Sequence, residues 1–339
     1  GVSGAEILAT ILDFSPEPRE VEPPPEPWDP AEPSLADVAV RTVAGVVRHP
    51  VTLLRTLPRS LPHVLDLPGA TNFPGVRTVN DLAGLAGRLV GLTDGAPGRD
   101  LRTPRTPLNR TITAHRRFSF GSLPLDEIKA VKNAFGMTLN DVVMTLTTTA
   151  LRRWMLDHDG LPNVPIVVAV PVSIRTDDGA EGNQVSVMLA EMPTHLADPR
   201  ARLDFVRESM NEAKRQFEAV PATILQDLSA VLPTALSGLS SRALFRLLTV
   251  PGLPFNLFVS NVPGPQMPLY VSGARVLGIY PVSAVTDLTG ALNITLFSYD
   301  GALDFGLIAA REVVPDVWNL IDYLREALDE LLELDEVEA

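Results

Sequence analysis

Short polar side chains at Ser260 and Asn261 end an apolar run just before Val262-Pro263-Gly264-Pro265, a stiff loop. A hydroxyl and an amide on rigid backbone suit stabilisation of an oxyanion, because they need little reorganisation during the reaction. We therefore predict that both contact an oxyanion or an acceptor substrate, with Ser283 as a further contact of that kind. The alternative is that Asn261 only bonds the turn backbone. Asn293 and Thr295 are two more polar residues, and they lie between apolar neighbours. We predict that both bind substrate.

Asn140 and Asp141 form a second polar pair, in the first turn of a helix predicted to begin at Thr138. Thr138 as N-cap with a carboxylate three residues later imitates a capping box, and that carboxylate complements the helix dipole. We therefore interpret Asp141 as structural support of a site. For Asn140 two interpretations remain open: it lines a substrate site, or it has a structural role.

Arg175 closes the apolar run Pro171-Val172-Ser173-Ile174 and precedes Asp177-Asp178-Gly179. A planar guanidinium there is suited to bidentate pairing with a carboxylate. The alternative is a solvated arginine in an acidic turn.

No residue of the chain stands in a recognisable catalytic base, nucleophile or metal motif. The chain has no cysteine, and it lacks G-x-S-x-G, Walker, H-E-x-x-H and dinucleotide glycine patterns. The segment Asp304-Phe305-Gly306 matches the D-F-G motif of protein kinases, but neither a glycine-rich loop nor an H-R-D motif accompanies it. We interpret all five histidines as structural or surface residues: His49, His63, His115, His158 and His195. We predict no metal and no cofactor.

Several ordered blocks of sequence resemble the bacterial wax ester synthase/diacylglycerol acyltransferase family in its actinobacterial form. The resemblance implies a chloramphenicol acetyltransferase-like α/β fold. It also implies that the Asp-Phe-Gly block is structural and that Arg175 holds the catalytic loop in shape. The blocks are Leu139-Asn140-Asp141-Val142-Val143, Pro171-Val172-Ser173-Ile174-Arg175, Ser260-Asn261-Val262-Pro263-Gly264-Pro265, Tyr280-Pro281-Val282-Ser283, Asn293-Ile294-Thr295 and Ser298 to Gly306.

The family's catalytic signature is H-H-x-x-x-D-G, and Gly1 followed by Val2-Ser3-Gly4-Ala5-Glu6 resembles its last glycine and what comes next. The resemblance implies that the catalytic histidine lies just upstream of Gly1. This chain would then be a C-terminal part, inactive alone, whose partner is an N-terminal fragment of the same protein. In that family a neutral histidine deprotonates the acceptor hydroxyl, which attacks an acyl-CoA thioester.

The resemblance implies synthesis of triacylglycerol, and also wax esters, from long-chain acyl-CoA and diacylglycerol or a fatty alcohol. One alternative is a noncatalytic lipid-binding or scaffold subunit with the same fold. Another is a condensation-type acyltransferase that acts on carrier-bound substrates.

The charge of the chain is unevenly distributed. The net charge is −13, which argues against nucleic-acid binding, yet residues 34–117 carry twelve arginines and five aspartates, a net +7. Apolar runs are too short to span a membrane, so we expect a cytoplasmic protein, with membranes or lipid droplets as possible peripheral partners. Residues 34–67 are read either as interfacial amphipathic helices or as an ordinary helical pair packed on its own domain.

Three regions follow from this reading. Residues 1–14 are expected to be a short helix that ends the N-terminal acyltransferase domain. Residues 15–110 are a linker with eight prolines between residues 15 and 33, then basic amphipathic helices and a crossover. Residues 111–339 are the C-terminal acyltransferase domain, with strands expected at 111–120, 166–170, 184–192, 256–260, 291–299 and 303–309, and helices at 122–135, 138–156, 198–217 and from 315.

Overall fold

The computed structural model describes residues 8, 10–17, 103–173, 185–219, 255–287 and 289–338. Its helices are α4 (Leu125–Ala134), α5 (Leu139–Asp157), α6 (Pro199–Ala219), α9 (Asn319–Glu338) and the 3-10 turn η2 (Pro107–Asn109). The strands are β1 (Arg116–Pro124), β2 (Ile166–Ser173), β3 (Val185–Met192), β4 (Leu257–Pro263), β5 (Tyr270–Val271), β6 (Ala274–Arg275), β7 (Leu292–Tyr299) and β8 (Ala302–Ala310).

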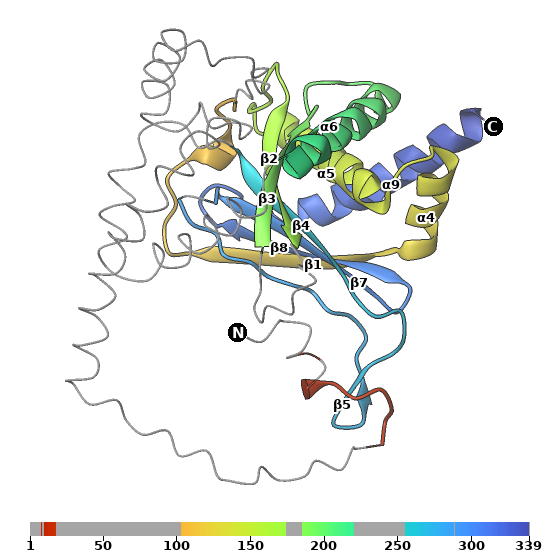
Figure 1. The fold of residues 1–339 in the computed structure, drawn as a ribbon. Helices are drawn as coiled ribbons and strands as arrows, with labels where there is room; N and C mark the ends of the chain where they lie inside the picture. Colours follow the sequence, from red (N-terminus) through yellow and green to blue (C-terminus); the bar gives the residue numbers. More distant parts are fainter. Residues whose placement is uncertain are drawn as a thin grey trace, which may run out of the picture.

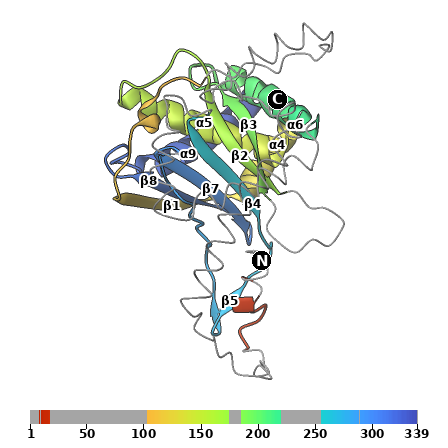
Figure 2. The same cartoon turned by 60° about the vertical axis from the view of Figure 1, so that its left-hand side comes forward.

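The six long strands form one mixed sheet in the order β1-β8-β7-β4-β2-β3. Strands β2, β4 and β7 are parallel, while the other neighbours are antiparallel. Helices α4, α5, α6 and α9 lie together on one face of this sheet (Figure 1) and remain on that face in the turned view (Figure 2). The arrangement is the α/β class expected from the sequence.

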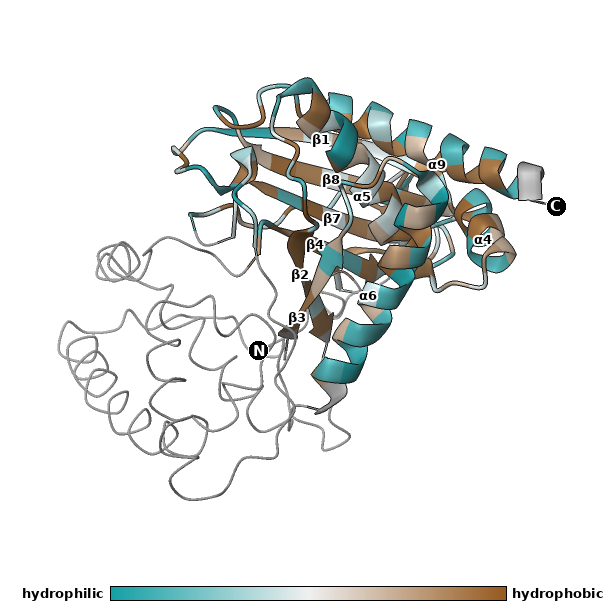
Figure 3. Cartoon of the chain, turned by 90° about the horizontal axis from the view of Figure 1, so that it is seen from above, coloured by the Kyte–Doolittle hydropathy of each residue, from teal (hydrophilic) through white to brown (hydrophobic). Residues whose placement is uncertain are grey.

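The core lies between the sheet and the helices. Alternate residues of β7, such as Leu292, Ile294 and Leu296, are buried there against helical side chains such as Leu320 and Leu324. The helices turn apolar residues toward the sheet and polar residues outward (Figure 3). Burying each such side chain contributes roughly 1.5–3 kcal/mol of transfer free energy. The opposite side of the sheet, here called the open face, is formed by the residues in between.

Helix α5 begins as its sequence predicts. The backbone N–H of Thr138 donates to Asp141 Oδ2 at 2.9 Å, and the N–H of Asp141 donates to Thr138 Oγ1 at 3.2 Å. This reciprocal capping box satisfies two N–H groups that a helix start otherwise leaves unpaired. Gly136 has φ +61°, the left-handed conformation that ends α4.

Several element boundaries differ from the prediction, including the end of β2, which lies at Ser173 rather than at residue 170. Strand β1 begins at Arg116 rather than at residue 111, and it continues past Ser122, which is therefore not a helix cap. Strand β4 extends to Pro263, so Ser260 and Asn261 lie inside it and not where it breaks. Helix α9 begins at Asn319, after turns that follow Pro315.

A small hairpin, β5–β6, projects from the sheet (Figures 1 and 2). Its Tyr270 exchanges two backbone hydrogen bonds with Asp13, at 2.8 and 2.9 Å. Leu12 packs beside it with Leu269, Phe297 and Tyr299. The N-terminal segment is helical at residues 10 and 11 and no longer helical at 12, earlier than the predicted end at residue 14.

Several predictions fall outside the described residues: Gly1, Arg175, most of the proline-rich linker and the amphipathic segment 34–67. Among the described residues, no helix has the length and apolar character needed to cross a bilayer.

Candidate functional site

Three of the predicted site residues meet on the open face of the central strands. Ser260 of β4 pairs with Thr295 of β7, and Thr295 pairs with Gly306 of β8, so these residues form one row across the sheet. Asn293 lies two residues before Thr295 in β7 and therefore shares its face. The structure thus places a hydroxyl from β4 beside a hydroxyl and an amide from β7.

Asn293 and Thr295 form a single hydrogen-bonded unit. The Thr295 hydroxyl donates to Asn293 Oδ1 at 2.7 Å, and both side chains are buried. Because its oxygen accepts this bond, Asn293 directs its NH2 group elsewhere as a donor. Ser260 is half-buried on the neighbouring strand, so the row combines an oriented amide with a more accessible hydroxyl.

A segment formed by residues 276–285, here called the strap, crosses the open face over β8 beside this row. The N–H of Ile279 donates to Asp304 Oδ2 at 2.7 Å, and the Ser122 hydroxyl donates to Asp304 Oδ1 at 2.6 Å. The Arg116 guanidinium donates to the carbonyl of Val285 at 2.8 Å. The strap is therefore fixed near both ends by side chains of β1 and β8.

The glycine of the Asp-Phe-Gly block lets the strap lie close to the sheet. A Cβ on Gly306 would clash with the carbonyl oxygen of Pro281. Phe305 points the other way into the helical core, where its side chain is 1% exposed. Asp304, Phe305 and Gly306 thus have structural tasks, as the resemblance implied.

The remaining predicted site residues lie elsewhere. Asn261 follows Ser260 directly, so strand alternation turns it to the helix-covered face. Ser283 is exposed within the strap, between its two fixed ends. Asn140 is half-buried in the first turn of α5, and Asp141 is buried in the capping box of that helix. Among the described residues, no side-chain hydrogen bond joins Asn261, Ser283, Asn140 or Asp141 to Ser260, Asn293 or Thr295.

The rings of His158 and His195 pack against aromatic side chains of α5 and α6. His158 stacks on Trp154 with ring centroids 4.2 Å apart, and its Nδ1 lies 2.7 Å from the Trp154 carbonyl. His195 lies beside α5, where Arg152 donates to its carbonyl at 3.2 Å. Burial lowers the pKa of His195, and the nearby positive charge of Arg152 lowers it further. His49 and His63 lie outside the described residues.

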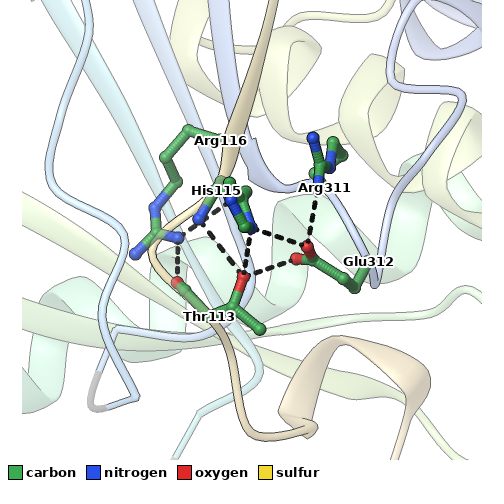
Figure 4. Close-up of polar contacts among 5 residues, drawn as sticks. All are labelled: Thr113, His115, Arg116, Arg311 and Glu312. Carbon is green, nitrogen blue, oxygen red and sulfur yellow. Dashed lines mark hydrogen bonds and ion pairs between the residues drawn. The ribbon is translucent and has the colours of Figure 1, made fainter.

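His115 belongs to an exposed polar cluster with Thr113, Arg116, Arg311 and Glu312 (Figure 4). Thr113 Oγ1 donates to Glu312 Oε2 at 2.8 Å, and His115 Nδ1 lies 3.2 Å from Glu312 Oε1 and 3.3 Å from Thr113 Oγ1. In a nucleophilic triad the histidine bridges hydroxyl and carboxylate with its two nitrogens. Here one nitrogen faces both groups and the hydroxyl bonds the carboxylate directly, so the cluster is not a proton relay.

The same cluster gives a pH-dependent contribution to stability. The pKa of Glu312 lies below its ordinary value, chiefly because the Thr113 hydroxyl donates to the carboxylate, with smaller help from His115 and Arg311. The stabilisation is therefore present above the pKa of an unfolded glutamate and is lost as pH falls through the lowered folded-state pKa. We expect Glu312→Gln to lower the thermal midpoint slightly at neutral pH, with a gap to wild type that closes on acidification. A gap independent of pH would contradict this assignment.

Sequence reasoning missed Asn256, which makes the most hydrogen bonds of the buried amides among the described residues. Its Oδ1 accepts from the N–H of Val167 at 2.9 Å, and its own N–H donates to the Val167 carbonyl at 2.7 Å. Its Nδ2 donates to the carbonyl of Pro104 at 2.8 Å and to Asn109 Oδ1 at 2.6 Å. Asn256 thus joins the chain entering the domain to the start of β2 and β4. The sequence signal that could have identified Asn256 is its position just before an apolar strand.

Within the described residues no group of three or more His, Asp or Glu side chains is placed to hold a metal ion. The polar groups of Ser260, Thr295 and Asn293 are hydroxyls and an amide, which bind and orient oxygen atoms. Such groups stabilise charge that develops during a reaction but do not act as a base near neutral pH.

Comparison with known proteins identifies two matching family models. Residues 1–143 match the wax ester synthase/diacylglycerol acyltransferase catalytic domain, and residues 181–332 match the WS/DGAT C-terminal domain. A Mycobacterium tuberculosis protein, named as a diacylglycerol O-acyltransferase, is 43% identical over 237 residues, covering 67% of this chain and 50% of its own length. The O-acyltransferase WSD of Acinetobacter baylyi is 37% identical over 229 residues, covering 67% of this chain and 48% of its own length.

A solved structure with similar architecture is the wax ester synthase/diacylglycerol acyltransferase from Marinobacter aquaeolei VT8. It aligns with a TM-score of 0.58 at 33% identity, covering 77% of this chain and 56% of that one. The chain spans about half the length of the first curated relatives that it matches.

Proposed function

Because the chain belongs to the wax ester synthase/diacylglycerol acyltransferase family, we propose that it forms part of an acyl-CoA-dependent O-acyltransferase. Its products would be triacylglycerol and wax esters, made from long-chain acyl-CoA and either diacylglycerol or a fatty alcohol. The observation that carries the proposal is the row formed by Ser260, Thr295 and Asn293 on the open face of the sheet. The chain that contains this row aligns with the wax ester synthase/diacylglycerol acyltransferase from Marinobacter aquaeolei VT8.

In the proposed reaction the acceptor hydroxyl loses its proton to a base and attacks the thioester carbonyl, giving a tetrahedral oxyanion. Collapse of this intermediate breaks the carbon–sulfur bond, and the protonated base returns the proton to the CoA thiolate. Ser260 would donate to the oxyanion or hold the acceptor oxygen, since a preorganised donor stabilises charge without reorganisation. Asn293, oriented by Thr295, would bind substrate beside it. Asn261 and Ser283 are secondary candidates for contact to the same substrates.

We propose that the base is a histidine in an H-H-x-x-x-D-G motif outside residues 1–339. This is supported by the stacking of the His158 ring on Trp154 and by the geometry of the His115 cluster. The chain alone would then be inactive, and a partner segment carrying the motif would complete the site. Gly1, Asp141 and Arg175 would support that site structurally, and no metal or cofactor would be required.

A thiol-release assay tests this proposal with little background, because the chain contains no cysteine. Long-chain acyl-CoA and diacylglycerol would be supplied to the chain alone and to the chain joined to an upstream segment that carries the motif. We expect CoA release and triacylglycerol only from the joined protein, and loss of both when the motif histidine is replaced by alanine. Full activity from the chain alone would contradict the assignment of the base.

A noncatalytic lipid-binding subunit is the competing function. It predicts that the joined protein binds diacylglycerol but releases no CoA with any acyl-CoA or alcohol. The cytoplasm, at the surface of a membrane or lipid droplet, is the proposed location of either form.

A further inference from the structure

A short segment in front of β1, residues 110–115, is here called the entry segment. It forms neither helix nor strand, and all of its residues except Ile112 are exposed. Its backbone is bonded to the domain at Ile112, whose N–H donates to Asp287 Oδ1 at 3.0 Å. Exposed irregular segments are the parts of a fold that a modifying enzyme reaches most easily.

Thr113 of the entry segment follows Arg110 by three residues. Protein kinases discriminate between substrates by charge patterns of this kind, and an arginine three residues before the hydroxyl is recognised by basophilic kinases. Among the described residues, the only other serine or threonine with this spacing is Ser119, which follows Arg116. Ser119 is 0% exposed, whereas Thr113 is exposed. Spacing and exposure together therefore single out Thr113.

The Thr113 hydroxyl lies among charged groups (Figure 4). It donates to Glu312 Oε2 at 2.8 Å, and Arg311 lies 3.4 Å from the Glu312 carboxylate. Arg116 donates to the Thr113 carbonyl, and Asp287 bonds the neighbouring backbone. A phosphate on Oγ1 would bring about two negative charges to the atom that now bonds Glu312. It would repel that carboxylate and attract both arginines.

Arg116 connects the entry segment with the strap. Its guanidinium donates to the carbonyls of Thr113 and His115, the latter at 3.0 Å, and also to the carbonyl of Val285 at 2.8 Å. A phosphate on Thr113 would offer this guanidinium a charged acceptor, whereas the Val285 carbonyl is neutral. The phosphate would therefore compete for Arg116 and release the strap at Val285.

We propose that Thr113 is a phosphorylation site and that its phosphate loosens the strap at Val285. A protein kinase would transfer the γ-phosphoryl group of ATP to Thr113 Oγ1, which gives up its proton, and ADP would leave. The strap lies beside the polar row on the open face, so loosening it would regulate that site; this part rests on the proposed function. The other end of the strap would stay in place, because Asp304 holds it through Ile279.

Phosphorylation of the 339-residue chain is measured with ATP and a purified kinase that prefers arginine three residues before its target. We expect one phosphate, located at Thr113 by mass spectrometry, and none in Thr113→Val. Arg110→Ala should slow incorporation by about tenfold. Thr111→Val is the matched control and should react like wild type, because Thr111 is exposed in the same segment but follows Leu108 by three residues. Phosphorylation elsewhere, or none, would overturn the assignment.

Two backbone amides report the state of the strap by hydrogen–deuterium exchange. The N–H of Thr286, next to Val285, donates to Thr289 Oγ1 at 2.7 Å. The N–H of Ile279 donates to Asp304 Oδ2 at 2.7 Å, at the end that should stay fixed. Their exchange needs no acyl-CoA, so failure of this experiment is distinct from failure of the proposed function.

Phosphothreonine is introduced during translation at Thr113, or at Thr111 as the control. With phosphate on Thr113 we expect amide exchange at Thr286 to become at least about tenfold faster, and exchange at Ile279 to change little. Arg116→Gln should accelerate exchange at Thr286 in the same way without phosphate. Unchanged exchange at Thr286, or an equal increase with phosphate on Thr111, would overturn the proposed release of the strap.

Discussion

Gly306→Ala will displace the strap from the sheet and lower the free energy of unfolding. The new methyl group would overlap the carbonyl oxygen of Pro281, which belongs to the backbone and cannot rotate away. Relieving the overlap must shift the strap, which weakens the bond from Ile279 to Asp304 beside it. We expect a loss of about 1–3 kcal/mol in the free energy of unfolding, typical of overpacking, measured by urea denaturation.

Gly301→Asn is the matched control for this change. Gly301 has φ +85°, and a Cβ there would meet no atom within 4 Å. Asparagine tolerates the left-handed conformation better than other residues with a side chain, so its cost should be small. If Gly306→Ala and Gly301→Asn were equally stable, the close approach of strap and sheet would not be important.

Asn256→Ala should be the most destabilising single polar substitution in the described domain. Asn256 is fully buried, and its amide satisfies the Val167 N–H, the Pro104 carbonyl and Asn109 Oδ1. A buried group left without its partner costs about 1–3 kcal/mol, and alanine would leave more than one such group. We expect the unfolding free energy to fall by about 2–4 kcal/mol in the same urea experiment.

Asn133→Ala provides the comparison, because Asn133 is exposed on α4. Surface substitutions of this kind usually change stability by less than about 0.5 kcal/mol. Asn256→Asp should not rescue the loss, since its second oxygen would face the Pro104 carbonyl in place of a donor. Wild-type stability of Asn256→Asp would show that the Nδ2 bonds contribute little.

Local sequence signals predicted the elements whose causes are local. The start of α5 was predicted because Thr138 and Asp141 lie three residues apart and satisfy each other's backbone groups. The end of α4 was predicted because Gly136 adopts a positive φ at low cost. The apolar run of residues 166–170 predicted strand β2, and these five residues are buried.

Errors arose where a distant partner decides the role of a residue. Ser122 has the chemistry of a helix cap, but it lies in β1 and bonds Asp304, 182 residues away. The strap has no regular secondary structure, so no periodicity could predict it, and its contacts with Asp304 and Gly306 are long-range.

The candidate site residues show the same difference between what local sequence predicts and what long-range contacts decide. Ser260, Asn293 and Thr295 were identified in sequence as separate polar positions, and only strand register brings them into adjacent positions. Ser260 and Asn261 were considered together because they are consecutive, yet consecutive strand residues face opposite sides. Sequence order therefore pointed to strand β4, and alternation along that strand places Ser260 on the open face.

The proposed role of Ser260, Asn293 and Thr295 on the open face is tested most directly by the steady-state rate of acyl transfer by the joined protein carrying Ser260→Ala, Asn293→Ala or Thr295→Val. Thr148→Val is the control, because Thr148 is buried in α5 and its hydroxyl bonds only a carbonyl of its own helix, at 2.7 Å. We expect a fall in kcat on the order of 10²-fold for Ser260→Ala, smaller losses for the other two variants, and wild-type kcat for the control. Wild-type kcat and KM in all three row variants, with folding intact, would contradict it.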